Sequence, residues 1–430
     1  MKLQNAKGTR DFSPQDKILR ENVVDTLKSI FKLYGYNPIE TPILERFEIL
    51  SAKYAGGDEI LKETFSLVDQ GKRKLGLRYD LTVPFARYVG MNPTMKLPFK
   101  RYQIGRVFRD GPIKLGRYRE FWQCDVDVVG SKTMMAEAEL LAIAERFFSE
   151  IGLGVTIRVN NRKLLDALID YAAISKNKDD VILSLDKLEK IGRANVKKEL
   201  ASKGVTEKST EKMLDFFDSM DNEDNLSRLE YIKKTLGANE GTAEIESLLE
   251  LTEKLELKNV RLDISLARGL SYYTGTVYEV FLDSEKFTSA IAAGGRYDNM
   301  VSEFLNSKQE YPCVGISFGL EGIIDILKMD PKEQKKSVVD FFIVPIGTPK
   351  DSLKIAQELR SKDLNVDLDI IGRGISKNLD FANKFNIPFV LFIGENELQE
   401  DKIKLKNMKT GKEQFLKRNG LAKELKKLQE

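Results

Sequence analysis

KRYQIGRVFRDGPIKLGRYREFWQCDVDVVG, residues 100–130, predicts a β-hairpin in which a long loop joins two strands. Residues 101–108 and 120–129 are rich in the aromatic and β-branched side chains that favour strands. The segment between them, DGPIKLGRYR, contains two glycines and one proline and predicts a loop. Seven Lys or Arg and four Asp or Glu within the stretch distinguish it from an ordinary buried strand pair.

The polar residues of this hairpin predict a ligand site. Three arginines line the loop and its base: Arg109, Arg117 and Arg119. Guanidinium groups are permanently charged forks that suit phosphate oxygens. Three residues after the loop alternate onto one strand face: Gln123, Asp125 and Asp127. A phosphate clamp beside an acidic pocket indicates a site for a nucleotide and a cationic small molecule, and a solvated hairpin with surface ion pairs is the alternative.

Composition limits the class of protein without choosing a function. A chain of 430 residues predicts two or three domains, and 42% hydrophobic with 31% charged residues is ordinary for a globular protein. No apolar run reaches the ~18 residues needed to cross a bilayer, and the start MKLQNAKGTRDF has no apolar signal segment. We therefore expect a cytoplasmic protein without membrane contact. Because the net charge is only +3, nucleic-acid binding would depend on local patches.

The chain contains no histidine and only two cysteines, Cys124 and Cys313. The absence of histidine excludes Ser-His-Asp and Cys-His triads, His-ligated metals and an imidazole base. The cysteines have no metal-ligand spacing, so we expect no protein-bound metal and a reducing compartment. Any chemistry must use carboxylates, Arg, Lys or groups of the substrate.

The first 90 residues predict a helix, an extended edge and a polar strand. Ser13 and Pro14 predict a capped helix that continues to about residue 33. YNPIETPILERFEIL, residues 36–50, predicts an extended segment in which prolines exclude a central strand, and this edge is a candidate subunit contact. Residues 74–90 place Arg78, Asp80 and Thr82 at a spacing of two, which predicts one polar strand face, lining a cavity or facing solvent.

The middle of the chain predicts a helical module within a strand-rich domain. Residues 134–150 predict an amphipathic helix, and residues 171–257 are highly charged, helical in pattern and poor in aromatics. Strand patterns return at VRLDISLARGLSYYTGTVYEVFL and AIAAGGRYDNMV, and CVGISFGLEGIIDIL predicts a strand that meets a helix across Gly315 and Gly319. The pair Gly294–Gly295 would permit close backbone approach to a ligand, although such pairs also mark plain turns.

The last hundred residues predict a separate α/β unit after the Lys-rich linker PKEQKKS. Strands and helices alternate from residue 338, which predicts a small, mostly parallel sheet whose last strand, DKIKLKNM, precedes a terminal helix. Residues 402–427 carry ten Lys or Arg and two acids, which predicts either a solvated surface or an RNA-facing patch.

Together these motifs resemble the histidyl-tRNA synthetases, a family of class IIa aminoacyl-tRNA synthetases, over essentially the whole chain. Pro42 resembles motif 1, FRDGPIKLGRYREFWQ resembles motif 2 and GISFGLEGI resembles motif 3. LARGLSYYTG resembles the signature specific to the histidyl enzymes. The resemblance implies an α+β fold: an antiparallel-sheet catalytic domain (1–170 and 258–330), a helical insertion (171–257), a linker (331–337) and an α/β anticodon-binding domain (338–430).

The resemblance also implies a function. Members form histidyl-adenylate from L-histidine and ATP, bound with Mg²⁺, and transfer the histidyl group to tRNA(His), usually as homodimers. The residues expected at ATP are Arg109, Arg117, Phe121 and Arg268, with Arg109 and Arg268 catalytic at the α-phosphate. The residues expected at histidine are Asp80 and Thr82 for the α-amino group, Gln123 for the carboxylate, and Asp127 with Tyr272 or Tyr273 for the imidazole.

Three positions depart from the family pattern. Gly322 stands where motif 3 usually has an arginine, Ser271 where the histidyl signature commonly has Asp, and Gly111 where motif 2 often has Glu. These departures leave open a paralogue that binds histidine or tRNA as a regulator, such as an ATP phosphoribosyltransferase regulatory subunit. A class II synthetase for another amino acid is disfavoured by LARGLSYYTG.

Overall fold

The computed structural model describes residues 1–52, 61–175, 177–220, 224–269, 272–329 and 335–429. The chain packs into two units, Met1–Arg10 with Val23–Asp330, and Asp11–Asn22 with Pro331–Glu430. Among the described residues, no helix has both the length and the apolar composition that a membrane span requires.

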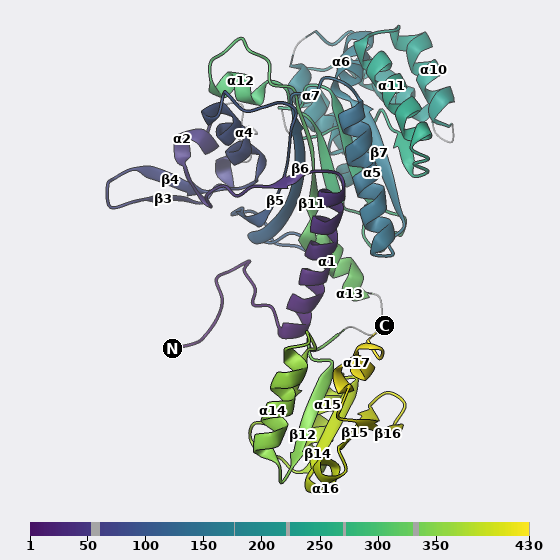
Figure 1. Cartoon of the computed structure of the whole chain (residues 1–430). Helices are drawn as coiled ribbons and strands as arrows, with labels where there is room; N and C mark the ends of the chain where they lie inside the picture. Colours follow the sequence, from purple (N-terminus) through teal and green to yellow (C-terminus); the bar gives the residue numbers. More distant parts are fainter. Residues whose placement is uncertain (53–60, 176, 221–223, 270–271, 330–334, 430) are drawn as a thin grey trace. The chain divides into compact units, whose positions relative to one another are not determined.

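An eight-stranded sheet forms the centre of the first unit (Figure 1). Its order is β1-β5-β6-β11-β10-β9-β7-β8, with parallel pairing at β1/β5 and β7/β8 and antiparallel pairing elsewhere. The strands are β1 (Asn37–Pro38), β5 (Phe99–Phe108), β6 (Glu120–Val129), β7 (Val155–Asn161), β8 (Val260–Leu262), β9 (Thr276–Leu282), β10 (Ala292–Arg296) and β11 (Cys313–Gly319). The predicted hairpin is confirmed, since β5 and β6 pair from Phe99↔Val129 to Phe108↔Glu120.

Helices cover one face of this sheet. The ring of Phe318 on β11 contacts Phe31 of α1 and both Phe147 and Phe148 of α5, with ring centroids 5.2–6.0 Å apart. Since Phe318 pairs with Cys124 across the β6–β11 ladder, the alternate residues of both strands point to the opposite face. The helices outside the insertion are α1 (Pro14–Leu33), α2 (Phe47–Leu50), α4 (Thr82–Met91), α5 (Met135–Glu150), α12 (Met300–Phe304) and α13 (Leu320–Met329).

Among the described residues, six helices lie between β7 and β8 in the sequence and share a core of buried apolar residues. They are α6 (Arg162–Tyr171), α7 (Lys178–Leu185), α8 (Leu188–Ser202), α9 (Glu207–Asp218), α10 (Asn225–Leu236) and α11 (Glu240–Lys254). Figure 1 shows them gathered together, as the helical pattern predicts.

Two predictions for the N-terminal region are wrong. Residues 74–82 do not form one strand, because β4 (Lys74–Leu77) ends before Arg78 and Thr82 begins α4. The Asp80 carboxylate accepts the backbone N–H of Val83 at 3.0 Å and so caps the helix. Phe47–Leu50 is the short helix α2 rather than extended chain. β4 instead joins a small sheet with β2 (Leu44–Arg46) and β3 (Ser66–Val68).

The second unit contains a five-stranded sheet of order β13-β12-β14-β15-β16. Its elements are β12 (Phe341–Ile346), α14 (Pro349–Arg360), β13 (Val366–Leu368), α15 (Ile375–Lys384), β14 (Phe389–Gly394), α16 (Glu395–Gln399), β15 (Lys402–Asn407), β16 (Glu413–Lys417) and α17 (Leu421–Lys426). β13, β12 and β14 are parallel, whereas β15 and β16 are antiparallel. The prediction that β15 is the last strand is wrong, because Gly411 at φ 72° lets the chain turn back into β16.

Candidate active site

A pocket of about 310 Å³ opens on the face of the large sheet opposite α1 and α5. β6 contributes every second side chain to it, because Gln123, Asp125 and Asp127 line the pocket while Cys124 and Val126 lie in the core. The charged residues among those lining it are Glu63, Asp80, Arg109, Arg117, Asp125, Asp127, Asp186, Lys190, Arg268 and Glu279.

The floor of the pocket is a buried ion pair between neighbouring strands. Arg101 of β5 lies opposite Asp127 of β6, and Arg101 Nη2 is 2.7 Å from Asp127 Oδ2. Tyr297 donates its hydroxyl to Asp127 Oδ1 at 2.6 Å. A Cβ atom at Gly315, opposite Asp127 on β11, would lie 1.8 Å from that carboxylate. Glycine at 315 therefore gives the Asp127 side chain its space.

Three buried polar groups beside this pair face the pocket. Burial raises the pKa of Asp80 to about 6, against the Val83 N–H hydrogen bond and the charge of Arg109. Burial also raises the pKa of Asp125 to about 7, and the neighbouring Asp127 charge adds to the increase while Arg101 opposes it. Within the described parts of the chain, Asp125 Oδ1 and Gln123 Oε1 have no hydrogen-bond partner. These buried acceptor atoms are available to a polar ligand.

The loop between β5 and β6 holds its arginines through contacts at both ends. Arg109 donates from Nε to the Tyr79 carbonyl at 3.0 Å. Arg117 Nη2 is 3.1 and 3.3 Å from the two carboxylate oxygens of Glu63. Tyr118 donates its hydroxyl to Asp325 of α13 at 3.2 Å. The loop is thus fixed against other elements, with two guanidinium groups at the pocket.

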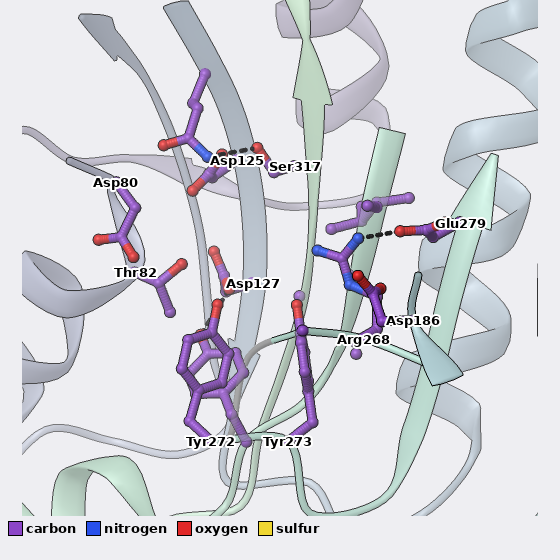
Figure 2. A pocket seen from close by; sticks show the side chains of 18 of the residues that line it. Asp80, Thr82, Asp125, Asp127, Asp186, Arg268, Tyr272, Tyr273, Glu279 and Ser317 are labelled. Carbon is purple, nitrogen blue, oxygen red and sulfur yellow. Dashed lines mark hydrogen bonds and ion pairs between the residues drawn. The ribbon is translucent and has the colours of Figure 1, made fainter. Parts of the chain in front are cut away.

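Arg268 lies across the pocket from Asp80 and Asp125, beside two tyrosines (Figure 2). It forms an ion pair with Glu279 of β9, and its guanidinium carbon is 5.7 Å from the centre of the Tyr273 ring. The Tyr272 and Tyr273 rings are 4.7 Å apart. Figure 2 therefore places the guanidinium group of Arg268 at the end of the pocket away from Asp80 and Thr82.

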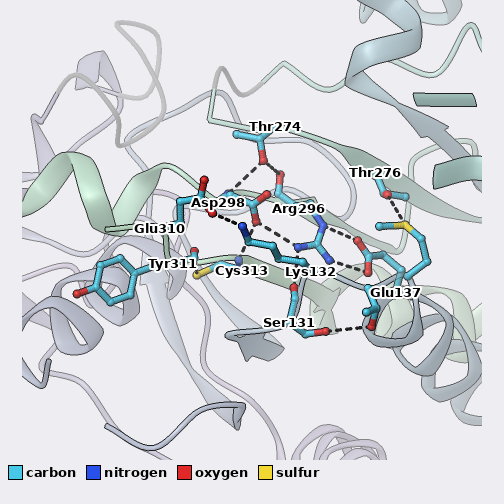
Figure 3. Close-up of polar contacts among 12 residues, drawn as sticks. Ser131, Lys132, Glu137, Thr274, Thr276, Arg296, Asp298, Glu310, Tyr311 and Cys313 are labelled. Atoms are coloured by element: carbon cyan, nitrogen blue, oxygen red, sulfur yellow. Dashed lines mark hydrogen bonds and ion pairs between the residues drawn. The ribbon is translucent and has the colours of Figure 1, made fainter. Parts of the chain in front are cut away.

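The wall formed by Gly294 and Gly295 is fixed by the next residue of β10, Arg296 (Figure 3). Arg296 donates from Nε and Nη2 to the two oxygens of Glu137 on α5, at 2.7 and 2.8 Å. Arg296 Nη1 also donates to the Ser131 carbonyl at 2.8 Å. Both charged side chains are almost fully buried, with 4% and 0% exposure.

The structure brings together most residues that the sequence predicts for the site. Nine of them line the pocket: Asp80, Thr82, Arg109, Arg117, Gln123, Asp127, Arg268, Tyr272 and Tyr273. Phe121 does not line it, but its ring centre is 5.2 Å from the Arg109 guanidinium carbon. Arg78, predicted on the same face as Asp80, instead donates to the Thr41 carbonyl at 2.6 Å. It is buried below Gly105, where a Cβ atom would lie 2.5 Å from Arg78 Nη2.

Sequence reasoning left several pocket residues without a role. They are Glu63, Asp186, Lys190, Glu279 and Tyr297, with Arg101 beneath them. Asp125 is predicted in the acidic pocket because it alternates with Gln123 and Asp127, and it lines the pocket. The others come from segments far apart in the sequence, and no local pattern marks them.

Two of the three departures have a structural account. A Cβ atom at Gly111 would lie 2.7–2.9 Å from the Glu63 carboxylate, so Glu63 brings an acidic group to the position that motif 2 often fills from residue 111. A Cβ atom at Gly322 would lie 3.2 Å from the ring of Phe287, which occupies the space beside it. Ser271 lies outside the described residues.

Comparison with known proteins agrees with this geometry. Residues 8–323 match the histidyl-tRNA synthetase family model, and residues 340–428 match an anticodon binding domain model. The chain belongs to the histidyl-tRNA synthetase family. A relative named histidine–tRNA ligase 1 from Bacillus cereus is 47% identical over 416 residues, covering 96% of this chain and 97% of its own.

Solved structures of this family share the fold. The histidyl-tRNA synthetase of Nostoc sp. PCC 7120 is 32% identical, with a TM-score of 0.87 over 99% of both chains. A structure described as an ATP phosphoribosyltransferase regulatory subunit/histidyl-tRNA synthetase from Bacillus halodurans C is 21% identical, with a TM-score of 0.75 over 92% of this chain and 99% of its own. The second likeness shows the fold alone. The class II synthetase fold that the sequence predicts is therefore confirmed.

Asp125 should make histidine use depend on pH. Its raised pKa means that the carboxylate is mostly neutral at pH 6 and mostly ionised at pH 8. An ionised carboxylate binds a cationic or N–H donor group better, so the advantage of the wild type over Asp125→Asn in kcat/KM for histidine should grow by roughly 10-fold between these values. Histidine-dependent ATP–pyrophosphate exchange across this range measures the ratio, in which the titration of the substrate imidazole cancels. A ratio that stays constant contradicts a role for the Asp125 charge.

The Arg296–Glu137 pair should contribute to the stability of the pocket wall. Arg296→Met leaves the buried Glu137 carboxylate without its bidentate partner and should lower the free energy of unfolding by about 3–5 kcal/mol. Arg296→Met with Glu137→Leu should recover most of this loss, because the fully buried Glu137 charge is removed as well, while Asp298, the other carboxylate partner of Arg296, is 31% exposed and keeps the backbone N–H of Cys313. Urea unfolding followed by fluorescence of Trp122, the one tryptophan of the sequence, reports on this unit alone. Equal losses in the single and double variants would show that packing, rather than the unpaired charge, is responsible.

Proposed function

We propose that this chain, a histidine–tRNA ligase, carries out both steps of its reaction at this pocket. The carboxylate of L-histidine attacks the α-phosphorus of ATP, which forms histidyl-adenylate and releases pyrophosphate. The histidyl group then passes to the 3′ end of tRNA(His), and AMP leaves. The observation that carries the residue assignment is one pocket lined both by arginines of the β5–β6 loop and by carboxylates of β6.

The first step needs positioned cations rather than a protein base. The attacking carboxylate is already ionised, so catalysis consists of alignment and neutralisation of the charge that develops on phosphate. We assign Arg109 and Arg268 to the α-phosphate, Arg117 to the other phosphates and Phe121 to the adenine ring. Arg109 and Arg268 approach from different elements, so they can hold the reacting phosphate between them.

Mg²⁺ is proposed to enter bound to ATP. The described residues contain no group of three or more His, Cys, Asp or Glu side chains placed to hold a metal. Mg²⁺ is commonly held by phosphates, water and only one or two carboxylates, and the pocket carboxylates fit that arrangement. The ion would neutralise phosphate charge.

Histidine is proposed to bind over β6. Asp80 and Thr82 would receive the α-amino group, and Gln123 would bind the carboxylate end. Asp127 would accept the imidazole N–H, with Tyr272 and Tyr273 beside the ring. Asp127 is suited to this role because Arg101 and Tyr297 fix its carboxylate, so binding needs little reorganisation.

The second unit is proposed to bind the anticodon of tRNA. One face of β15 and β16 carries Lys402, Lys404, Lys417 and Phe415, which share cross-strand rows. Phe415 is 60% exposed. Lysines that contact phosphates and a ring that stacks on a base are typical of RNA-binding surfaces. Asn378 of α15 is fully buried and donates to Asp369 at 3.0 Å, so it does not belong to this surface.

The domain bounds, the dimer and the location remain proposals of the same kind. We propose catalytic (1–170 and 258–330), insertion (171–257), linker (331–337) and anticodon-binding (338–430) segments. A homodimer is supported by apolar side chains that are exposed near motif 1 and on the β2–β4–β3 sheet: Ile43, Leu44, Leu67 and Val68. Analytical ultracentrifugation of the purified chain would measure the oligomeric state. Two cysteines in 430 residues suit the cytoplasm, and cell fractionation would test that location.

The regulatory alternative is not favoured. The similarity to ligases reaches 47% identity and covers 96% of the chain, and the anticodon-binding match extends over residues 340–428. Both features are expected of an enzyme that attaches histidine to tRNA. Histidine-dependent ATP–pyrophosphate exchange separates the two functions, since a pure regulator would give none.

Arg268→Ala should reduce histidine-dependent ATP–pyrophosphate exchange by at least ~100-fold, because it removes a cation at the reacting phosphate. The matched control is Arg146→Ala on α5, which also breaks an Arg–Glu ion pair, at 2.9 Å, but lies on the exposed side of that helix. Its exchange rate should equal that of the wild type. Wild-type exchange in Arg268→Ala would refute the assignment.

Reversing two charges on the β15–β16 face should weaken tRNA charging and leave adenylate formation unchanged. The double variant Lys402→Glu with Lys417→Glu should raise the KM for tRNA by about 10-fold or more and lower the salt dependence of charging. Lys350→Glu with Lys354→Glu, two exposed lysines at α14, is the charge-matched control. If both double variants charge tRNA equally well, this face does not bind RNA.

A further inference from the structure

A turn of the helical insertion reaches the active-site pocket. α7 ends at Leu185, and α8 is interrupted at Gly192, whose φ of 76° and ψ of 162° are not helical. Residues 186–191, which include the first turn of α8, are therefore set off from α7 on one side and from the rest of α8 on the other. We name this segment the 186–191 turn. Two of its residues, Asp186 and Lys190, line the pocket.

The 186–191 turn is attached to the large sheet by charge. Glu189 forms an ion pair with Arg158 of β7. Arg158 is also 3.5 Å from Asp263, and its guanidinium carbon lies 4.4 Å from the centre of the Phe281 ring on β9. The contact joins an insertion residue to two strands of the sheet, so the turn has a defined place relative to the pocket.

At that place the turn lies next to the residues of the histidyl signature. Figure 2 shows the Asp186 side chain beside Arg268. A Cβ atom on the neighbouring Gly269 would lie 3.4 Å from Asp186 Oδ2. Lys190 Nζ is 3.0 Å from the same oxygen, and the lysine side chain is 68% exposed. The ammonium group is thus at the mouth of the pocket, close to the cation assigned to the α-phosphate.

Lys190 differs from the other cations of the pocket in its freedom to move. Among the described residues, the pocket has four cationic side chains: Arg109, Arg117, Lys190 and Arg268. Each arginine is held by a backbone carbonyl or a pocket carboxylate that is partly or fully buried. Lys190 is 68% exposed, and its partner Asp186, which is 21% exposed, lies four residues away on the same turn. An ion pair with so exposed a lysine contributes little and breaks easily. A lysine on a flexible stem is well suited to follow phosphate groups that change position.

We propose that Lys190 binds the β- and γ-phosphates of ATP and the pyrophosphate product, so that the insertion supplies part of the nucleotide site. The proposal rests on the proposed ligase reaction. Lys190 would supply the positive charge that an arginine of motif 3 usually supplies in the family. In this chain Gly322 stands at that arginine position, and Phe287 fills the space beside it. Asp186 holds the ammonium group until phosphate competes for it.

The test is ATP–pyrophosphate exchange by the full-length chain, with the KM values for ATP, pyrophosphate and histidine measured separately. Lys190→Ala should raise the KM for ATP and for pyrophosphate by roughly 10-fold and leave the KM for histidine within about twofold. Lys190→Arg should retain most of the binding. The control is Lys197→Ala on α8, a lysine that is 39% exposed and pairs with Glu211 at 3.2 Å, which should match the wild type.

Asp186→Asn separates phosphate binding from a structural role of the pair. If the Lys190–Asp186 contact only supports the turn, Asp186→Asn and Lys190→Ala should raise the same constants. If Lys190 binds phosphate, Asp186→Asn should lower the KM for pyrophosphate, because the competing carboxylate charge is gone. Unchanged KM values for ATP and pyrophosphate in Lys190→Ala would overturn the proposal, and so would a defect confined to transfer onto tRNA. Absence of exchange in the wild type would instead refute the ligase reaction itself.

Discussion

The pairing of β6 with β11 is the constraint on which the rest of the catalytic unit depends. In this ladder Phe318 lies opposite Cys124 and packs under α1 and α5, while Gly315 lies opposite Asp127 and leaves space for its carboxylate. A shift of one residue would move the acidic side chains into the apolar core and the core residues into the pocket. The same register therefore sets the hydrophobic core and the ligand site.

Charge in the pocket is arranged so that each buried carboxylate has a definite environment. Burial raises the pKa of Asp80, Asp125 and Asp127, but at Asp127 the charge of Arg101 and the hydroxyl of Tyr297 oppose the increase and fix the carboxylate. Asp127 is suited to steady recognition of an N–H donor. Asp80 and Asp125 are suited to a substrate that brings its own positive charge, because such a ligand favours their ionised form.

Local patterns predicted the elements well where one face of a strand or helix is apolar, as in β5, β6, α5 and α13. They failed between Arg78 and Thr82, where the carboxylate that seemed to belong to a strand face caps α4. They also failed where a partner comes from a distant segment, as Glu63 does beside Gly111 and Phe287 beside Gly322. Residue spacing indicates which residues are neighbours within one helix or strand, whereas contacts between distant segments depend on how several elements pack together. The site residues predicted from the family signature reached the pocket because the signature records that packing.

The insertion leaves the sheet after β7 and returns at β8, two neighbouring parallel strands. The Arg158–Glu189 contact is one of several that fix the orientation of the insertion, beside the packing of α11 on α5 and the hydrogen bonds from Asn225 and Arg228 of α10 to the backbone of β8. Any ligand held jointly by the sheet and the 186–191 turn favours that orientation, and by thermodynamic reciprocity the orientation favours the ligand by the same factor. A macromolecule that binds the insertion outside the pocket would then change the affinity of the pocket for its ligand without touching the pocket. The ion pair between Arg158 and Glu189, which holds the 186–191 turn to β7, would contribute to that coupling.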